Sequence, residues 1–173
     1  DLLTYVWGAA LFLCPIDRDK MLIFQDAGGF GLLEAVQVKI LIVEADEVFR
    51  RNISQRLRLE GHQIHEAGGE NEAKLIIQRI DVDVVLLGLG KLKKRGMVLL
   101  REIKRIRPLT EVMLLTPSEE HSLSLSIEGM KAGAFDELLV PFDMETLLGR
   151  LGEAYRKRLQ KKREGKPRMR VRS

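Results

Sequence analysis

The stretch DVVLLGLGKLKKRGMVLLREIKRIRP, residues 83–108, contains the pattern that decides the fold. Its first six residues form a short run rich in valine and leucine, which is typical of a strand buried on both faces of a parallel sheet. After a basic loop, Leu99, Leu100, Ile103 and Ile106 recur at the three- and four-residue spacing of a helix with one apolar face. The stretch therefore predicts a buried strand followed by a packed helix.

The same alternation of strand and helix continues on both sides of this stretch. Four more apolar runs, residues 38–43, 62–67, 111–116 and 135–140, are too short to be helices. Five strand and helix pairs in this order predict an α/β fold: a doubly wound, five-stranded parallel sheet with right-handed crossovers. The other helical stripes are Phe49, Ile53 and Leu57; Ala73, Ile76, Ile77 and Ile80; Leu123, Ile127 and Met130; and Met144, Leu147, Leu148, Leu151 and Tyr155.

Glycines and short polar residues mark the expected helix ends. Gly61 and Gly133 stand where a helix closes with a left-handed residue. Ser118 and Asp143 stand where a helix needs a cap, and Asp46 is expected to cap or start the first helix. In a parallel sheet of this kind the ligand site lies beyond the carboxyl ends of the strands. Functional residues are therefore expected just after the apolar runs.

The composition is that of a folded globular protein. Of the 173 residues, 45% are hydrophobic and 31% are charged. Cys14 is the single cysteine, so an intramolecular disulfide is excluded. His62, His65 and His121 do not show the spacing of a metal site, and none is expected.

Residues 1–37 are interpreted as an apolar N-terminal extension. Because the first residue is Asp1 and not methionine, we expect this end to be a fragment or a processed terminus. Residues 2–16 carry no charge but are fewer than the ~20 needed to span a bilayer. Two interpretations stay open, a truncated membrane helix and an apolar helix that packs on the domain or on a partner. The glycines at 28, 29 and 31 lack the strand, lysine and serine spacing of a phosphate loop.

Residues 159–173 are interpreted as a basic C-terminal tail after a domain of residues 38–158. From Arg156 onward there are ten basic residues and one acid, Glu164, so this part carries +9 while residues 1–155 carry −5 of the net +4. Two readings stay open for residues 156–173. One is an inert linker, and the other is unspecific, salt-dependent binding of nucleic acid or an anionic membrane.

Four segments together resemble the receiver domain of two-component response regulators. They are KILIVEADEVFR (39–50), the stretch at 83–108, EVMLLTPSEE (111–120) and KAGAFDELLVPFD (131–143). The resemblance implies a flavodoxin-like (βα)5 fold and a bacterial, cytoplasmic signalling protein that is not an enzyme. In that family an aspartate after the third strand accepts phosphate from a histidine kinase, two acids after the first strand hold Mg²⁺, and a threonine and a lysine contact the phosphoryl group.

Most of these positions have changed in this chain. Gly88 stands at the acceptor position, Glu44 and Ala45 at the acidic pair, and Val140, before Pro141, at the lysine position. Thr116 matches the family, whereas Glu137 stands at the aromatic switch position. Asp83 lies at the opposite end of its strand and cannot replace the acceptor. The sequence therefore predicts a degenerate pseudo-receiver without a cofactor, in which Glu44 alone gives weak or lost Mg²⁺ binding.

The loop after Gly88 carries four cations, Lys91, Lys93, Lys94 and Arg95. It is a candidate anion-binding loop, or one that attracts an acidic partner, although a run of charges is more often simply a solvated loop.

The leading functional hypothesis is a protein interaction module that does not become phosphorylated. Its expected partner is a histidine kinase, another regulator or a second copy, held through the face of residues 120–158. The alternatives are an atypical phosphoacceptor and a regulator that binds nucleic acid through the basic tail.

Overall fold

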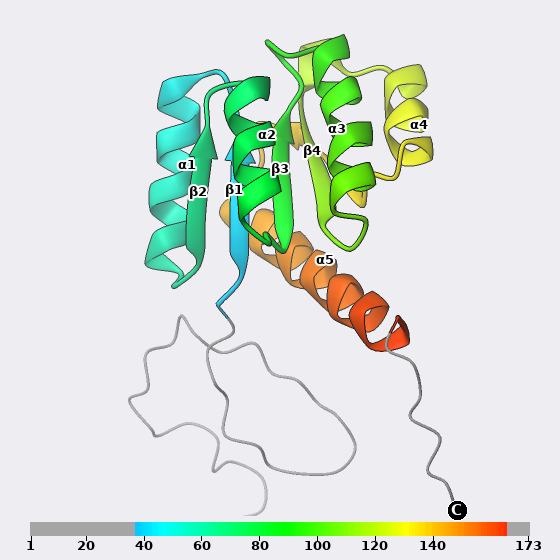
Figure 1. Ribbon diagram of the computed structural model, residues 1–173. Coiled ribbons are helices and arrows are strands. Elements are labelled where there is room, and N and C mark those ends of the chain that lie inside the picture. The colour runs from blue at the N-terminus through cyan, green and yellow to red at the C-terminus, as the bar shows by residue number, and fades with distance from the viewer. Residues whose placement is uncertain (1–36, 166–173) are drawn as a thin grey trace, which may run out of the picture. The chain divides into compact units, whose positions relative to one another are not determined.

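The computed structural model describes residues 37–165. Strands and helices alternate through this range, with one short 3-10 helix, η1, before the fourth α-helix (Figure 1). The elements are β1 (Lys39–Val43), α1 (Glu47–Leu59), β2 (Gln63–Ala67), α2 (Glu70–Arg79), β3 (Val84–Gly88), α3 (Lys94–Ile106), β4 (Glu111–Pro117), η1 (Ser118–Glu120), α4 (Leu123–Lys131), β5 (Asp136–Val140) and α5 (Met144–Glu164). Each predicted strand is confirmed to within one residue at either end.

The five strands form one parallel sheet in the order β2, β1, β3, β4, β5. In its register Val43 lies opposite Leu87, Gly88 opposite Leu115, and Thr116 opposite Leu139. The predicted doubly wound α/β fold is thus confirmed. The carboxyl ends of β1, β3, β4 and β5 meet at one edge of the sheet.

The sheet is buried on both faces. One core layer packs β-strand residues such as Leu41, Val85 and Leu114 against α2 and α3. Alternate residues of the same strands, such as Ile42 and Leu86, are also fully buried and point to the other face. Figure 1 shows α2 and α3 in front of the sheet and α5 behind it. This two-sided burial explains why the strands read as continuous apolar runs.

The apolar stripe predicted for the fourth helix is wrong. Leu123, Ile127 and Met130 are 71%, 45% and 41% exposed. The helix α4 instead packs through Gly129, where an added Cβ would lie 2.5 Å from Cδ1 of Leu114. A helix that packs closely through a glycine leaves its larger apolar side chains free to point outward.

The predicted helix ends are mostly correct. Gly61 and Gly133 have left-handed backbone angles, φ +85° and +97°, and the Asp143 carboxylate accepts a hydrogen bond from the Thr146 N–H at 2.7 Å at the start of α5. The cap predicted at Ser118 is wrong, because η1 intervenes and Ser122 caps α4 instead.

Residues 1–36 and 166–173 lie outside the described residues, and with them most of the predicted N-terminal extension, Cys14 and the end of the predicted tail. Among residues 37–165, no helix combines the length and apolar character needed to cross a membrane.

Candidate functional site

A cavity of about 550 Å³ opens at the carboxyl edge of the sheet. Its charged lining consists of four carboxylates and two lysines, and the rest is largely apolar. The charged residues of the lining are Glu44, Asp46, Glu119, Glu120, Lys91 and Lys93. Its apolar residues include Phe49, Leu115, Pro117, Val140 and Pro141. The structure thus brings the predicted pocket residues Glu44, Val140 and Pro141 into one cavity.

Glu44 occupies the space beside Gly88. Its side chain is buried, with the residue 8% exposed, and its Oε1 accepts the N–H of Asp46 at 2.8 Å. A Cβ placed on Gly88 would lie 1.9 Å from Oε2 of Glu44 and 2.8 Å from its Cδ. An aspartate at position 88 is therefore incompatible with this position of the Glu44 carboxylate.

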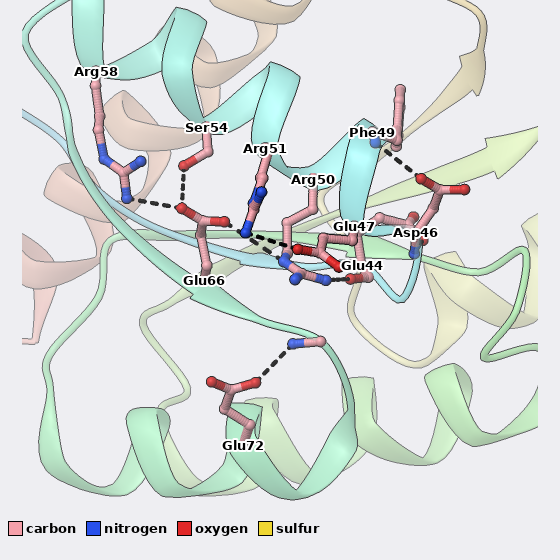
Figure 2. Close-up of polar contacts among 11 residues, drawn as sticks. Glu44, Asp46, Glu47, Phe49, Arg50, Arg51, Ser54, Arg58, Glu66 and Glu72 are labelled. Carbon is pink, nitrogen blue, oxygen red and sulfur yellow. Dashed lines mark hydrogen bonds and ion pairs between the residues drawn. The ribbon is translucent and has the colours of Figure 1, made fainter.

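The backbone around Glu44 is held from α1. The Arg50 guanidinium donates to the carbonyl oxygen of Glu44 at 2.6 Å and lies 3.5 Å from the Glu66 carboxylate (Figure 2). Asp46 caps α1 by accepting the Phe49 N–H at 2.9 Å, as predicted. That backbone hydrogen bond, together with nearby Lys91, holds the pKa of Asp46 below its usual value despite some desolvation.

Glu66 of β2 contacts several side chains of α1. Its carboxylate accepts hydrogen bonds from the Ser54 hydroxyl at 2.6 Å and from Arg58 at 2.8 Å (Figure 2). Desolvation acts to raise the pKa of Glu66, but these donors and the nearby arginines outweigh it and lower the pKa. The contacts tie α1 to β2 and so fix the loop that carries Glu44.

Thr116, at the end of β4, does not line the cavity but is engaged by Glu137. The Thr116 hydroxyl donates to Oε1 of Glu137 at 2.6 Å, and the Ser126 hydroxyl of α4 donates to Oε2 at 2.5 Å. His121 Nε2 lies 3.8 Å from the same carboxylate. Glu137 therefore connects β4, β5 and α4 through one partly buried group. The sequence placed Glu137 at the switch position but gave no sign of Ser126 or His121.

The four cations of the loop after Gly88 lie in different environments. Lys91 Nζ lies 3.7 Å from the Asp46 carboxylate, and Lys93 lines the cavity with a positive φ of 45° just before α3. Lys94 and Arg95 are exposed in the first turn of α3. Anion binding by this loop stays a prediction.

The helix α5 continues past the predicted domain end at residue 158, as far as Glu164, and buries Arg158. Arg158 is 3% exposed and lies 2.9 Å from Asp81, 2.8 Å from Asp83 and 3.3 Å from the Thr110 hydroxyl. Sequence reasoning missed this role, although position 158 continues the spacing of the buried residues Leu147, Leu151 and Ala154. Asp83 is confirmed at the end of β3 remote from the cavity.

Lys161 also forms an ion pair within the folded domain. It pairs with the buried Glu111 carboxylate, which lies 3.7 Å from Lys104. Burial lowers the pKa of Lys104, and the Glu111 charge opposes that shift only in part. Fewer cations of residues 156–173 are therefore available to a nucleic acid than the sequence suggests. Nucleic-acid binding through this segment stays a prediction.

The five-stranded parallel sheet and the polar pocket beyond its carboxyl edge define a receiver-like α/β signalling domain. The sequence matches the response regulator receiver domain family over residues 40–152, and the chain belongs to that family.

Relatives and solved structures agree with this assignment. The chain is 31% identical over 109 residues to the regulatory protein AtoC of Escherichia coli, covering 63% of this chain and 23% of AtoC. It is 29% identical over 116 residues to the transcriptional regulatory protein KdpE of Staphylococcus aureus, covering 67% and 49%. The chain thus spans about half or less of the length of these relatives.

The fold is shared with a CheY-like response regulator receiver domain protein of Methanospirillum hungatei. The TM-score is 0.68 at 23% identity, and the match covers 73% of this chain and 99% of that one. This chain therefore carries a receiver domain of two-component response regulators.

Proposed function

We propose that this receiver domain relays a signal through protein contacts that require no phosphorylation. The observation that carries the proposal is the pairing of Gly88 with Glu44. Glycine offers no oxygen to phosphorylate, and the Glu44 carboxylate fills the space into which a longer side chain would extend. A protein of this design is an interaction module and not a phosphoacceptor.

The groups that would support a magnesium ion are a poor match to its chemistry. Mg²⁺ favours near-octahedral coordination by oxygen, usually with more than one carboxylate or with phosphate. Glu44 supplies one buried carboxylate, Ala45 and Gly88 supply none, and Asp46 is used as a helix cap beside Lys91. Among residues 37–165 no group of three His, Cys, Asp or Glu side chains is placed to hold a metal ion. These features support weak or lost Mg²⁺ binding.

The Glu137 contacts support a single, fixed arrangement of the switch region. Thr116 already donates its hydroxyl proton to Glu137, and Ser126 ties α4 to the same carboxylate. A hydroxyl held in this way is not available to an incoming anion unless the hydrogen bond breaks. We infer that α4 stays in one position whether or not a phosphodonor is present.

The partner contact is assigned to α4 and β5. Leu123, Ile127, Met130 and Leu139 are large apolar side chains between 41% and 71% exposed, and several such residues together are a feature of protein interaction surfaces. The partner is a signalling protein, such as a histidine kinase or another regulator, or a second copy of the chain.

Intact mass after incubation with acetyl phosphate and Mg²⁺ tests the proposal. We expect the mass to stay unchanged, because the pocket offers no carboxylate at position 88. A receiver domain that keeps an aspartate at the matching position is the positive control and gains one phosphate. A stable gain of one phosphate by this chain would instead support the alternative of an atypical phosphoacceptor.

A further inference from the structure

The buried carboxylate of Glu44 is only half satisfied. Oε1 accepts the Asp46 N–H, whereas no donor among residues 37–165 hydrogen-bonds to Oε2. Oε2 is not sealed from solvent, because His65 Nε2 is the only fully buried side-chain nitrogen or oxygen without a partner in that range. An ionised carboxylate has about four lone-pair sites, so Oε2 can still accept a hydrogen bond from a donor that enters the cavity. Glu44 is more than nine-tenths buried and lines the cavity. The cavity therefore contains an acceptor without a donor.

The remaining charges of the cavity favour a cation. Lys91 is paired with Asp46 at 3.7 Å, so these two charges largely compensate each other. Glu119 and Glu120, both exposed in η1, have no ion-pair partner among the described residues. With Glu44 they oppose the single remaining lysine of the lining, Lys93. The lining is therefore net negative, which disfavours phosphate and other anions.

The rest of the lining suits a long aliphatic stem. Phe49, Leu115, Pro117, Val140 and Pro141 supply apolar surface, and the Phe49 ring is fixed edge-on against Phe142 at 6.2 Å between centroids. Lysine and arginine side chains combine such a stem with a cationic head that donates several hydrogen bonds. The stem matches the apolar wall, and the head matches Glu44 and the acids of η1.

We propose that the cavity receives a lysine or arginine side chain from a protein partner. The basic head donates to Oε2 of Glu44, and Glu119 and Glu120 attract it at the entrance. The proposal rests on the proposed function, because it gives the phosphorylation-independent module a specific contact. It also changes the role of the pocket, from a site of phosphoryl transfer to a socket for a cation.

The test uses the full chain labelled with ¹⁵N and three blocked tripeptides, with arginine, lysine or norleucine between two glycines. We expect the arginine or lysine peptide to shift the amide signals of Asp46, Gly90 and Val140 with saturation at about millimolar concentration. The norleucine peptide has the stem without the charge and should leave them unchanged. Inorganic phosphate is the fourth probe, and it should also leave them unchanged.

Two variants locate the contact. Glu44→Gln should weaken peptide binding by about tenfold, because a charge-assisted hydrogen bond becomes a neutral one. Glu60→Gln removes an acid at the far end of α1 and should have no effect. If Glu44→Gln lowers stability enough to obscure binding, the exposed pair Glu119→Gln and Glu120→Gln should still weaken it.

Three results would overturn the proposal. They are no shifts from either basic peptide up to about 10 mM, equal shifts from the norleucine peptide, or phosphate shifts at the same amides. None of them depends on the phosphodonor experiment, so the socket can fail while the proposed function holds. A mass gain from acetyl phosphate would overturn the proposed function without deciding whether the basic peptide binds.

Discussion

Gly88→Ala lowers the free energy of unfolding by about 1 kcal/mol, the low end for inserting a methyl group into a filled site, because the group that must move is the end of a flexible side chain. The new Cβ would lie 1.9 Å from Glu44 Oε2, a separation that no pair of non-bonded atoms tolerates. Glu44 would have to leave its position and give up the hydrogen bond to the Asp46 N–H. Urea denaturation followed by circular dichroism measures the loss.

The matched control is Gly149→Ala. An added Cβ at Gly149 meets nothing within 4 Å, and alanine is favoured over glycine inside a helix by up to about 1 kcal/mol. In a Glu44→Ala background the cost of Gly88→Ala should largely disappear, since the clashing carboxylate is gone. Equal costs in both backgrounds would show that Glu44 does not fill the space beside Gly88.

Arg158→Ala has the largest expected effect, a loss of about 3 kcal/mol, at the low end for breaking a buried ion pair. The substitution leaves Asp83, whose side chain is 17% exposed, without its guanidinium partner, and removes a donor from the buried Thr110. Asp81 loses less because its side chain is 56% exposed. Urea denaturation of the full chain measures the difference.

Two further variants separate charge from packing. Arg163→Ala removes an exposed cation from the same helix and should cost little. Arg158→Met keeps most of the buried volume and should cost less than alanine, because it leaves no cavity. A loss below about 1 kcal/mol for Arg158→Ala, within the range of an exposed ion pair, would contradict the structural role assigned to Arg158.

The pH dependence of the free energy of unfolding tests the contact between Arg158 and Asp81 independently. Partial desolvation acts to raise the pKa of Asp81, but the hydrogen bond and charge of Arg158 outweigh it and hold the pKa below 3.8. The stability from this pair is therefore fully present above pH 3.8 and is lost as pH falls through the lower folded-state pKa. The difference in the free energy of unfolding between wild type and Arg158→Ala, measured by urea denaturation at several pH values, should therefore become smaller in that acid range.

The sequence was sufficient for the sheet because strands buried on both faces have an unambiguous pattern. It was not sufficient for α4, where Gly129 allows close packing and leaves Leu123 and Ile127 outside. It also counted Arg158 among the cations of residues 156–173 that could bind nucleic acid, because residue type suggested solvent while helical spacing pointed to the core. Charge and periodicity conflicted at that position, and burial followed the periodicity.

In the pocket too, the sequence predicted where residues lie along the sheet but not which side chains they contact. Chain position was enough to place Glu44, Gly88 and Thr116 near one edge of the sheet, because parallel strands end together. Side-chain direction was not accessible from sequence. Neither the occupation of the Gly88 space by Glu44 nor the hydrogen bond from Thr116 to Glu137 follows from residue spacing.

We propose that the pocket does not accommodate a phosphoryl group at Gly88. The most direct test is the ¹⁵N spectrum of the full chain with Mg²⁺, recorded before and after addition of beryllofluoride, which imitates an aspartyl phosphate. We predict that the amide signals of Gly88, Leu89 and Thr116 do not change on adding beryllofluoride. Saturable shifts of those signals that require both Mg²⁺ and beryllofluoride would contradict the account.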